Sequence, residues 1–234
     1  MSRFSEYMTN EFSRVKYGAG ITFIDIDETV FRTFAKVLVI DKASGKVKRE
    51  LDNQEFNSYV LQDSEEFDFQ QFRSAEIFRK TSIPIKQTVN RIKKMLGNIH
   101  EKSLNSKIVF LTARADFDDK NEFLKTFETH GIKMDKPQVY VERTGNLKTG
   151  TVEERKKQVM LKYIRTGQYR RVRLIDDYWG NLKAIKEIED ELPKEIEDKV
   201  IKTYNLDYSD GQEHLPPISF YALHVQPDGS LKRV

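Results

Sequence analysis

The sequence predicts an α/β protein built in three layers around a parallel sheet, and three observations support this fold class. Short apolar runs alternate with amphipathic segments of helical period through most of the chain. Polar residues follow directly after several apolar runs, as is typical of strand ends in open α/β sheets. No repeat, low-complexity tract or interdomain linker divides the 234 residues, so we expect one domain spanning residues 1–234.

The alternation defines the main elements in order. Short apolar runs predict four buried strands at residues 21–25, 107–113, 138–142 and 171–177. Apolar residues at helical spacing predict four helices at residues 85–96, 120–131, 151–167 and 181–192. Thr151 and Glu154 have the spacing of a capping box, and Gly131 suits a helix C-cap. Strands that alternate with helices favour a parallel sheet covered on both faces.

Two segments depart from this alternation and predict β-hairpins. Residues 35–52 are expected to turn at "KASGK", within a flap or insertion at about residues 31–80. Residues 218–234 are expected to turn at "PDG". Residues 65–78 are acidic and aromatic, and we expect an irregular segment that leads into a helix. We interpret the nearby aromatic residues as core or flap packing: Phe56, Tyr59, Phe67, Phe69 and Phe72.

Composition narrows the class of protein. The net charge is +3, from 40 basic and 37 acidic residues, which argues against a dedicated nucleic-acid coat. We therefore interpret the basic clusters at 91–94 and 169–173 as solvated faces. The absence of cysteine excludes disulfides and thiolate metal sites. No secretory signal is apparent and no apolar run approaches the roughly 18 residues of a membrane span, so we expect a cytoplasmic protein.

Acidic residues gather at the predicted strand ends. Asp25 and Asp27 follow the first strand, and Asp176 and Asp177 end the fourth. The carboxyl ends of parallel strands share one edge of a sheet, so these four carboxylates are expected to converge. Like charges this close repel unless a cation compensates them. Mg²⁺, which prefers oxygen ligands, is the expected cation.

Four motifs carry a family resemblance. "FIDIDETVF", "IVFLTAR", the lysines of "EERKKQVM" and "RLIDDYWGN" occur in the order and context of the motifs of haloacid dehalogenase (HAD) superfamily phosphatases. The resemblance covers residues 19–190 and implies a Rossmannoid HAD-like fold with a flap and little or no cap. The whole chain also resembles small HAD-like proteins of tailed phages, which would place it in the host cytoplasm but brings no known substrate.

The resemblance implies a role for each aspartate. Asp25 would be the nucleophile that forms an aspartyl-phosphate, and Asp27 the general acid and base. Mg²⁺ would be held by Asp25, Asp177 and the backbone carbonyl of Asp27. Asp176 would bind the metal through water or orient the site.

The remaining motif residues would contact the phosphoryl group or the substrate. Thr112 would donate a hydrogen bond to the phosphoryl group, and Thr29 stands beside the acidic pair as a substrate contact. The catalytic lysine is Lys156 or its rival Lys157, the other being a substrate contact or a solvated residue. Arg114 is either a substrate-phosphate contact or a surface arginine at a helix start.

The resemblance and the acidic cluster together predict a Mg²⁺-dependent phosphomonoester hydrolase. Nucleotides and nucleic-acid ends are candidate substrates, because a lightly capped site admits large molecules; no membrane partner is expected. Two alternatives remain open, namely a phosphotransferase and a binding or structural protein of the same fold with weak turnover. The sequence leaves the oligomeric state undetermined.

Overall fold

A six-stranded sheet forms the centre of the computed structural model, which describes residues 18–101, 105–208 and 216–234. The strand order is β11-β10-β9-β1-β7-β8, and every neighbouring pair is parallel except β10 and β11. The strands are β1 (Gly20–Ile24), β7 (Lys107–Thr112), β8 (Val139–Arg143), β9 (Arg171–Asp176), β10 (Ser219–Val225) and β11 (Leu231–Arg233).

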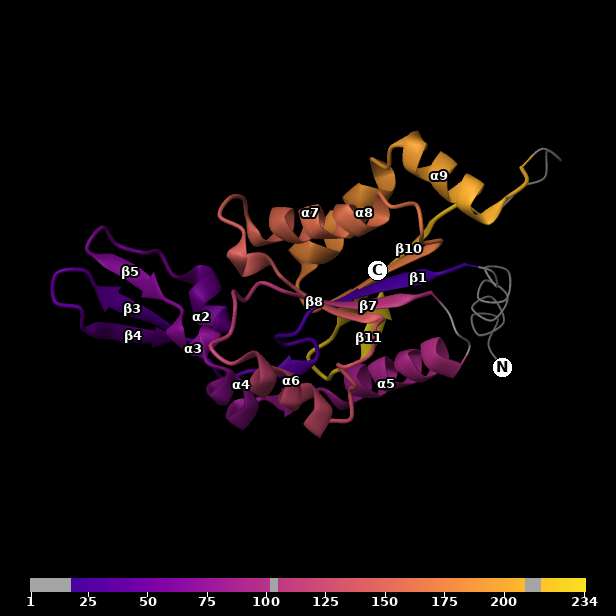
Figure 1. Ribbon diagram of the computed structural model, residues 1–234. Coiled ribbons are helices and arrows are strands. Elements are labelled where there is room, and N and C mark those ends of the chain that lie inside the picture. The colour runs from indigo at the N-terminus through magenta and orange to yellow at the C-terminus, as the bar shows by residue number, and fades with distance from the viewer. Residues whose placement is uncertain (1–17, 102–104, 209–215) are drawn as a thin grey trace.

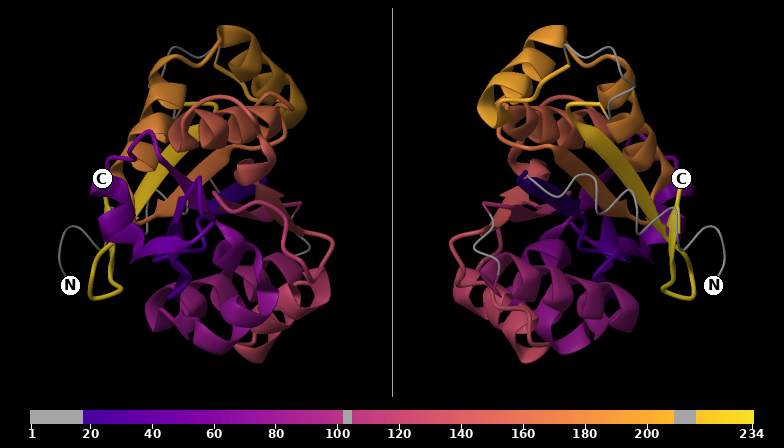
Figure 2. Two further views of the ribbon diagram at one scale, coloured as in Figure 1. Left: turned by 90° about the vertical axis from the view of Figure 1, so that its left-hand side faces the viewer. Right: turned by 90° about the vertical axis from the view of Figure 1, so that its right-hand side faces the viewer.

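Helices cover both faces of this sheet, which gives three layers (Figure 1 and Figure 2). One face carries α4 (Ala75–Thr81), α5 (Lys86–Glu101) and α6 (Lys120–Thr129). The other face carries α7 (Val152–Ile164), α8 (Trp179–Asp190) and α9 (Lys194–Tyr204). The α/β class, the mostly parallel sheet and the three layers predicted from the alternation are therefore confirmed, whereas α9 was not predicted.

The central strands are apolar on both faces because each face packs against helices. In β7, Ile108 and Phe110 belong to the core under α5 and α6, and Val109 and Leu111 belong to the core under α7 and α8. All four side chains have 0% exposure. Each such burial contributes about 1.5–3 kcal/mol, so β7 is a rigid support for the residues that follow it.

The helix-start and helix-end signals in the sequence behave as expected. Thr151 caps α7, and Glu154 completes the capping box by accepting from the Thr151 backbone N–H. Gly131 follows α6 with φ of +75°, a left-handed conformation that glycine adopts without strain. Asp119 caps the start of α6 with its side chain. These caps fix where α6 and α7 begin relative to the sheet.

The insertion between β1 and α5 forms a separate small sheet. The hairpin predicted at 35–52 is present as β3 (Val37–Asp41) and β4 (Val47–Leu51). Residues 65–78, predicted as irregular, begin instead with a strand, β5 (Glu65–Asp68), which pairs with β3 and makes the sheet three-stranded. Three of its four residues are acidic, so a prediction based on apolar runs missed this strand.

Short elements join this small sheet to the rest of the molecule. They are β2 (Phe31–Arg32), α2 (Asn53–Ser58), α3 (Gln70–Arg73) and β6 (Ile83–Pro84). The predicted aromatic packing is confirmed for Phe56, Tyr59, Phe67 and Phe72, which pack on the core of the small sheet, while Phe69 is 43% exposed and contacts Phe56 and Phe67. Figure 1 shows the small sheet extending away from the central sheet.

The C-terminal hairpin predicted at 218–234 is confirmed, and it also belongs to the central sheet. Its first strand, β10, pairs in parallel with β9, so the hairpin extends the central sheet by two strands. No helix among the described residues is long and apolar enough to cross a membrane.

Candidate active site

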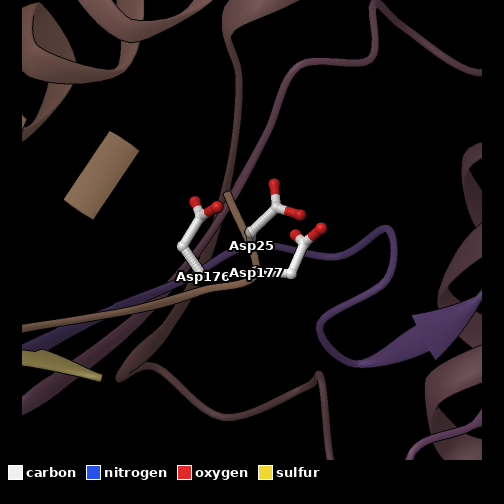
Figure 3. A group of neighbouring side chains, drawn as sticks. All are labelled: Asp25, Asp176 and Asp177. Atoms are coloured by element: carbon white, nitrogen blue, oxygen red, sulfur yellow. The ribbon is translucent and has the colours of Figure 1, made fainter. Parts of the chain in front are cut away.

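Three carboxylates converge where parallel strands of the central sheet end. Asp25 follows β1 directly, Asp176 is the last residue of β9, and Asp177 comes next. One carboxylate oxygen from each lies within 4.8 Å of the other two, an arrangement that could hold a metal ion (Figure 3). Strands β1 and β9 are adjacent and in register, with Ile24 opposite Ile175, so the acidic residues after them must meet.

Lys156 on α7 lies among these carboxylates. Its Nζ donates to Asp25 Oδ1 at 2.6 Å and to Asp176 Oδ2 at 2.9 Å. The Lys156 side chain is only 2% exposed. A fully buried ammonium needs paired carboxylates to offset its lost hydration, and here it has two. The rival Lys157 points elsewhere, since its Nζ bonds to Glu187 and Glu191 on α8 and just after it.

Asp176 is held more tightly than its neighbours. Its Oδ1 accepts from the backbone N–H of Tyr178 at 3.0 Å, and the Asn181 amide donates to both carboxylate oxygens at 3.0 Å. With Lys156 also donating to Oδ2, both oxygens of Asp176 are engaged. Asp176 has 0% exposure. It therefore orients Lys156 and the start of α8 more readily than it takes a new ligand.

Asp177 is fixed from two directions. Thr29, predicted as a substrate contact, is fully buried and donates its hydroxyl to Asp177 Oδ1 at 3.1 Å. The main-chain carbonyl of Asp177 lies 2.8 Å from Nε2 of His224 on β10, and Nδ1 of that ring lies 2.7 Å from the Gln226 amide nitrogen. The amide donates to Nδ1, which leaves Nε2–H as the donor to the carbonyl. Asp177 is thus held through both its side chain and its backbone.

The carboxylates carry more negative charge than Lys156 neutralises. Burial and the adjacent Asp176 carboxylate raise the pKa of Asp177 to about 7. Burial also raises the pKa of Asp25 well above its usual range, although Lys156 opposes this effect. In contrast, Asp176 and Asp25 raise the pKa of the Lys156 ammonium despite its burial. Lysine therefore stays charged, and the remaining excess is negative.

Asp27 lies in a different electrostatic environment. Arg114 donates to both of its carboxylate oxygens, from Nε at 2.9 Å and from Nη2 at 2.6 Å, and the Thr33 hydroxyl donates at 2.7 Å. Burial opposes ionisation, but the charge and hydrogen bonds of Arg114 outweigh it and lower the pKa of Asp27. Asp27 is therefore an ionised carboxylate in this structure, and its side chain keeps 20% exposure.

Arg114 is 4% exposed, so the interpretation as a surface arginine is wrong. Its guanidinium is paired with Asp27, and the contact with a substrate phosphate stays a prediction. Its Nη1 also donates to the carbonyl of Phe72 in α3 at 2.9 Å, and the guanidinium stacks on the Phe72 ring at 4.6 Å. Arg114 thus links the insertion to Asp27.

Thr112 ends β7 beside this group and is fully buried. Its hydroxyl oxygen accepts from the Arg114 backbone N–H at 3.1 Å. Its carbonyl accepts from the Thr144 hydroxyl, which anchors the 3₁₀ turn Thr144–Asn146 against the end of β7. The Thr112 hydroxyl still has a proton to donate.

Comparisons of this chain with protein family models, with curated proteins and with solved structures find no match. The site is therefore interpreted from its own residues.

The donor set fits a small divalent cation. All three converging groups are carboxylates, the ligands that Mg²⁺, Mn²⁺ and Ca²⁺ take in proteins. Within the described residues, Lys156 is the only hydrogen-bond donor to the Asp25 carboxylate, and it binds Oδ1, which leaves Oδ2 for a metal ion. A divalent cation would offset the negative excess that raises the pKa of Asp25 and of Asp177.

Sequence reasoning missed four residues that support the site. Two of them lie close in sequence to the aspartates that they contact, and this closeness could have indicated them. Thr33 lies six positions after Asp27, and Asn181 lies in the first turn of the helix after Asp176. No local sequence signal indicated His224 or Gln226. His224 contacts Asp177 only because β10 pairs in parallel with β9, and Gln226 contacts His224. That pairing depends on a crossover through α8 and α9.

Proposed function

We propose that this protein is a Mg²⁺-dependent phosphomonoester hydrolase of the HAD type, acting through an aspartyl-phosphate intermediate on Asp25. The observation that carries the proposal is the buried Lys156, which bridges Asp25 and Asp176 beside Asp177. A structural ion pair needs one carboxylate, whereas this lysine is surrounded by an excess of them. The four sequence motifs that resemble HAD phosphatases supply these same side chains, which supports the family assignment as a proposal.

The first step is attack by a carboxylate oxygen of Asp25 on phosphorus. A bond forms between this oxygen and phosphorus as the bond to the leaving alcohol oxygen breaks, and Asp27 delivers a proton to that oxygen. Lys156 and the Thr112 hydroxyl stabilise the negative charge on the phosphoryl oxygens. Asp27 must first gain a proton, and its pairing with Arg114 makes this costly.

The second step releases phosphate. Asp27, again a carboxylate, removes a proton from water, and the water oxygen attacks phosphorus. The bond between phosphorus and Asp25 breaks, which restores the carboxylate. Asp27 is already ionised and held by Arg114 and Thr33, so it is prepared for the base role.

Bound Mg²⁺ would supply charge neutralisation at the phosphoryl group and would be held by Asp25, Asp177 and the backbone carbonyl of Asp27. We propose nucleotides or phosphorylated nucleic-acid ends as substrates. Tyr178 follows Asp177 directly and is 50% exposed, so its ring is available to stack on a base. No feature of the described site favours phosphotransfer over hydrolysis.

The test is hydrolysis of an aryl phosphate with Mg²⁺ and with EDTA, followed by a panel of sugar phosphates, nucleotides and phosphorylated oligonucleotides. Activity should disappear in EDTA and return with Mg²⁺, while Ca²⁺ should replace it poorly because its larger shell misplaces the nucleophile. Activity that persists in EDTA would exclude the proposed metal role. A strong preference for small sugar phosphates would exclude the proposed substrate class.

A further inference from the structure

Three arginines gather on one face of the central sheet, away from the carboxylates. Arg171 and Arg173 alternate along β9, so both side chains lie on the face that α5 covers. Arg91 lies on α5, one turn before Met95, and Met95 Sδ is 3.5 Å from Nη1 of Arg173. All three arginines are half-buried. The sequence suggested that these basic clusters are solvated faces, and the structure instead places three of their arginines against the sheet.

Their hydrogen bonds leave most of the donor capacity unused. Arg173 Nη1 lies 3.3 Å from the Thr22 hydroxyl, and Arg171 Nη2 donates to the carbonyl of Gly18 at 2.8 Å. The Arg171 Nε–H is buried without a hydrogen-bond partner. Within residues 18–101, 105–208 and 216–234, none of the three guanidinium groups forms an ion pair with a carboxylate. The two buried cations of the candidate active site, Lys156 and Arg114, each have such a partner.

Arg91 and Arg171 both repel the charge of Arg173. Burial, followed by the charges of Arg91 and Arg171, lowers the pKa of Arg173 to about 10. Burial also lowers the pKa of Arg91 and of Arg171. Half-buried like charges without counter-charges destabilise a fold, and a bound anion would remove this cost.

We infer that Arg91, Arg171 and Arg173 form a binding site for a phosphate group. A guanidinium presents a rigid fork of donors that matches the oxygens of phosphate or carboxylate. Three guanidinium groups offer more N–H donors and more positive charge than one carboxylate can match, because a carboxylate has two oxygens and one negative charge. A phosphate group has up to four acceptor oxygens and up to two charges. The unpartnered Arg171 Nε–H is one of the donors that it would satisfy.

The surroundings of Arg173 favour this ligand. Arg173 lies over the ring of Tyr221, with its Cζ 5.8 Å from the ring centroid, and Tyr221 is its direct partner on β10. The aromatic face holds the guanidinium in place without neutralising it. Along β9 the fully buried Ile175 lies between Arg173 and the end of the strand, where Asp176 and Asp177 stand. The phosphate site is thus independent of the proposed active site.

The inference is tested by thermal unfolding in EDTA, with sodium phosphate compared with sodium chloride at equal ionic strength. Phosphate at about ten times its Kd should raise Tm by about 3–6 °C. Arg173→Gln and Arg91→Gln should each remove most of this rise. In chloride both variants should be at least as stable as the wild type, because each removes a repelling charge. Arg165→Gln is the matched control, an exposed arginine at the end of α7 that should keep the full rise.

A second arm separates the two sources of phosphate. Fluorescence anisotropy in EDTA measures binding of a labelled single-stranded oligonucleotide without terminal phosphates. Binding that Arg91→Gln weakens at least about tenfold identifies the backbone of a nucleic-acid strand as the ligand. A Tm rise without oligonucleotide binding identifies a small phosphate compound. Equal Tm in phosphate and chloride, or an equal rise in all four proteins, overturns the inference. Aryl phosphate hydrolysis should be unchanged in all three variants, so failure of the phosphate site is distinct from failure of the proposed function.

Discussion

Asp25 and Asp27 lie two residues apart in the loop after β1, but they differ in the amount of positive charge that pairs with each carboxylate. Asp25 shares one buried ammonium, Lys156, with Asp176, and burial raises its pKa. Asp27 has a guanidinium, Arg114, to itself, and its pKa is lowered. A carboxylate short of positive charge attracts a cation, whereas a carboxylate paired with a guanidinium keeps its position and is ionised at rest. Neighbouring identical residues thus acquire different chemistry from residues distant in sequence.

The strongest test of this difference is Asp25→Asn. The amide removes the attacking oxygen, so activity should fall by roughly 10⁴-fold or more. Initial rates of aryl phosphate hydrolysis with Mg²⁺ measure the effect. Wild-type turnover in this variant would show that Asp25 only pairs with Lys156. Circular dichroism confirms that the variant is folded.

Asp27→Asn should cost less, because only proton transfer is lost. We expect roughly a 10²–10⁴-fold loss with an alkyl phosphate and a smaller loss with an aryl phosphate, whose leaving group needs little protonation. The second step should slow as well, so phosphate should accumulate on Asp25. Mass spectrometry after acid quench detects the added phosphate. A variant that is equally slow with both substrates and carries no phosphate would contradict the assigned role.

Lys156→Met and Lys157→Met form a matched pair on one helix. Loss of Lys156 should reduce kcat by about 10²–10³-fold. It should also destabilise the metal-free protein by about 3–5 kcal/mol, because buried carboxylates lose their counter-charge. Loss of Lys157 should change stability by no more than about 1 kcal/mol, because its partners are on the surface. Urea unfolding and initial rates distinguish the two, and equal effects would remove Lys156 from the site.

The last prediction concerns the pH dependence of stability in EDTA. The folded-state pKa of Asp177 is about 7, above its usual 3.8, so the folded protein binds this proton more tightly than the unfolded chain. This contribution to stability is present at low pH and is lost as pH rises through about 7. We expect Tm in EDTA to fall between about pH 4 and pH 7 and to level off above about pH 7, and we expect Mg²⁺ to reverse the fall. Asp177→Asn should flatten the profile, and an unchanged slope would show that another group causes the fall.

The sequence predicted where these residues lie in the sheet better than it predicted which side chains they pair with. Buried strands place Asp25, Thr112 and Asp176 at one edge, and this follows from local pattern alone. The pairing of Asp27 with Arg114 spans 87 positions and depends on how a long side chain packs on Phe72. No local pattern encodes such a contact. The acidic strand β5 was missed for a related reason, because its pairing with β3 outweighs its weak apolar signal.

The hydrogen bond from His224 to the carbonyl of Asp177 has a consequence for synthesis of the chain. The two residues are 47 positions apart, and β10 must pair with β9 before the bond can form. At about 5–20 residues per second, translation needs about 2–9 s to pass from one to the other. During that interval β9 has no neighbour on its β10 side, and the acidic loop after it lacks its backbone anchor. A nascent chain at this stage presents an unpaired strand edge, which can pair with other chains until β10 is in place.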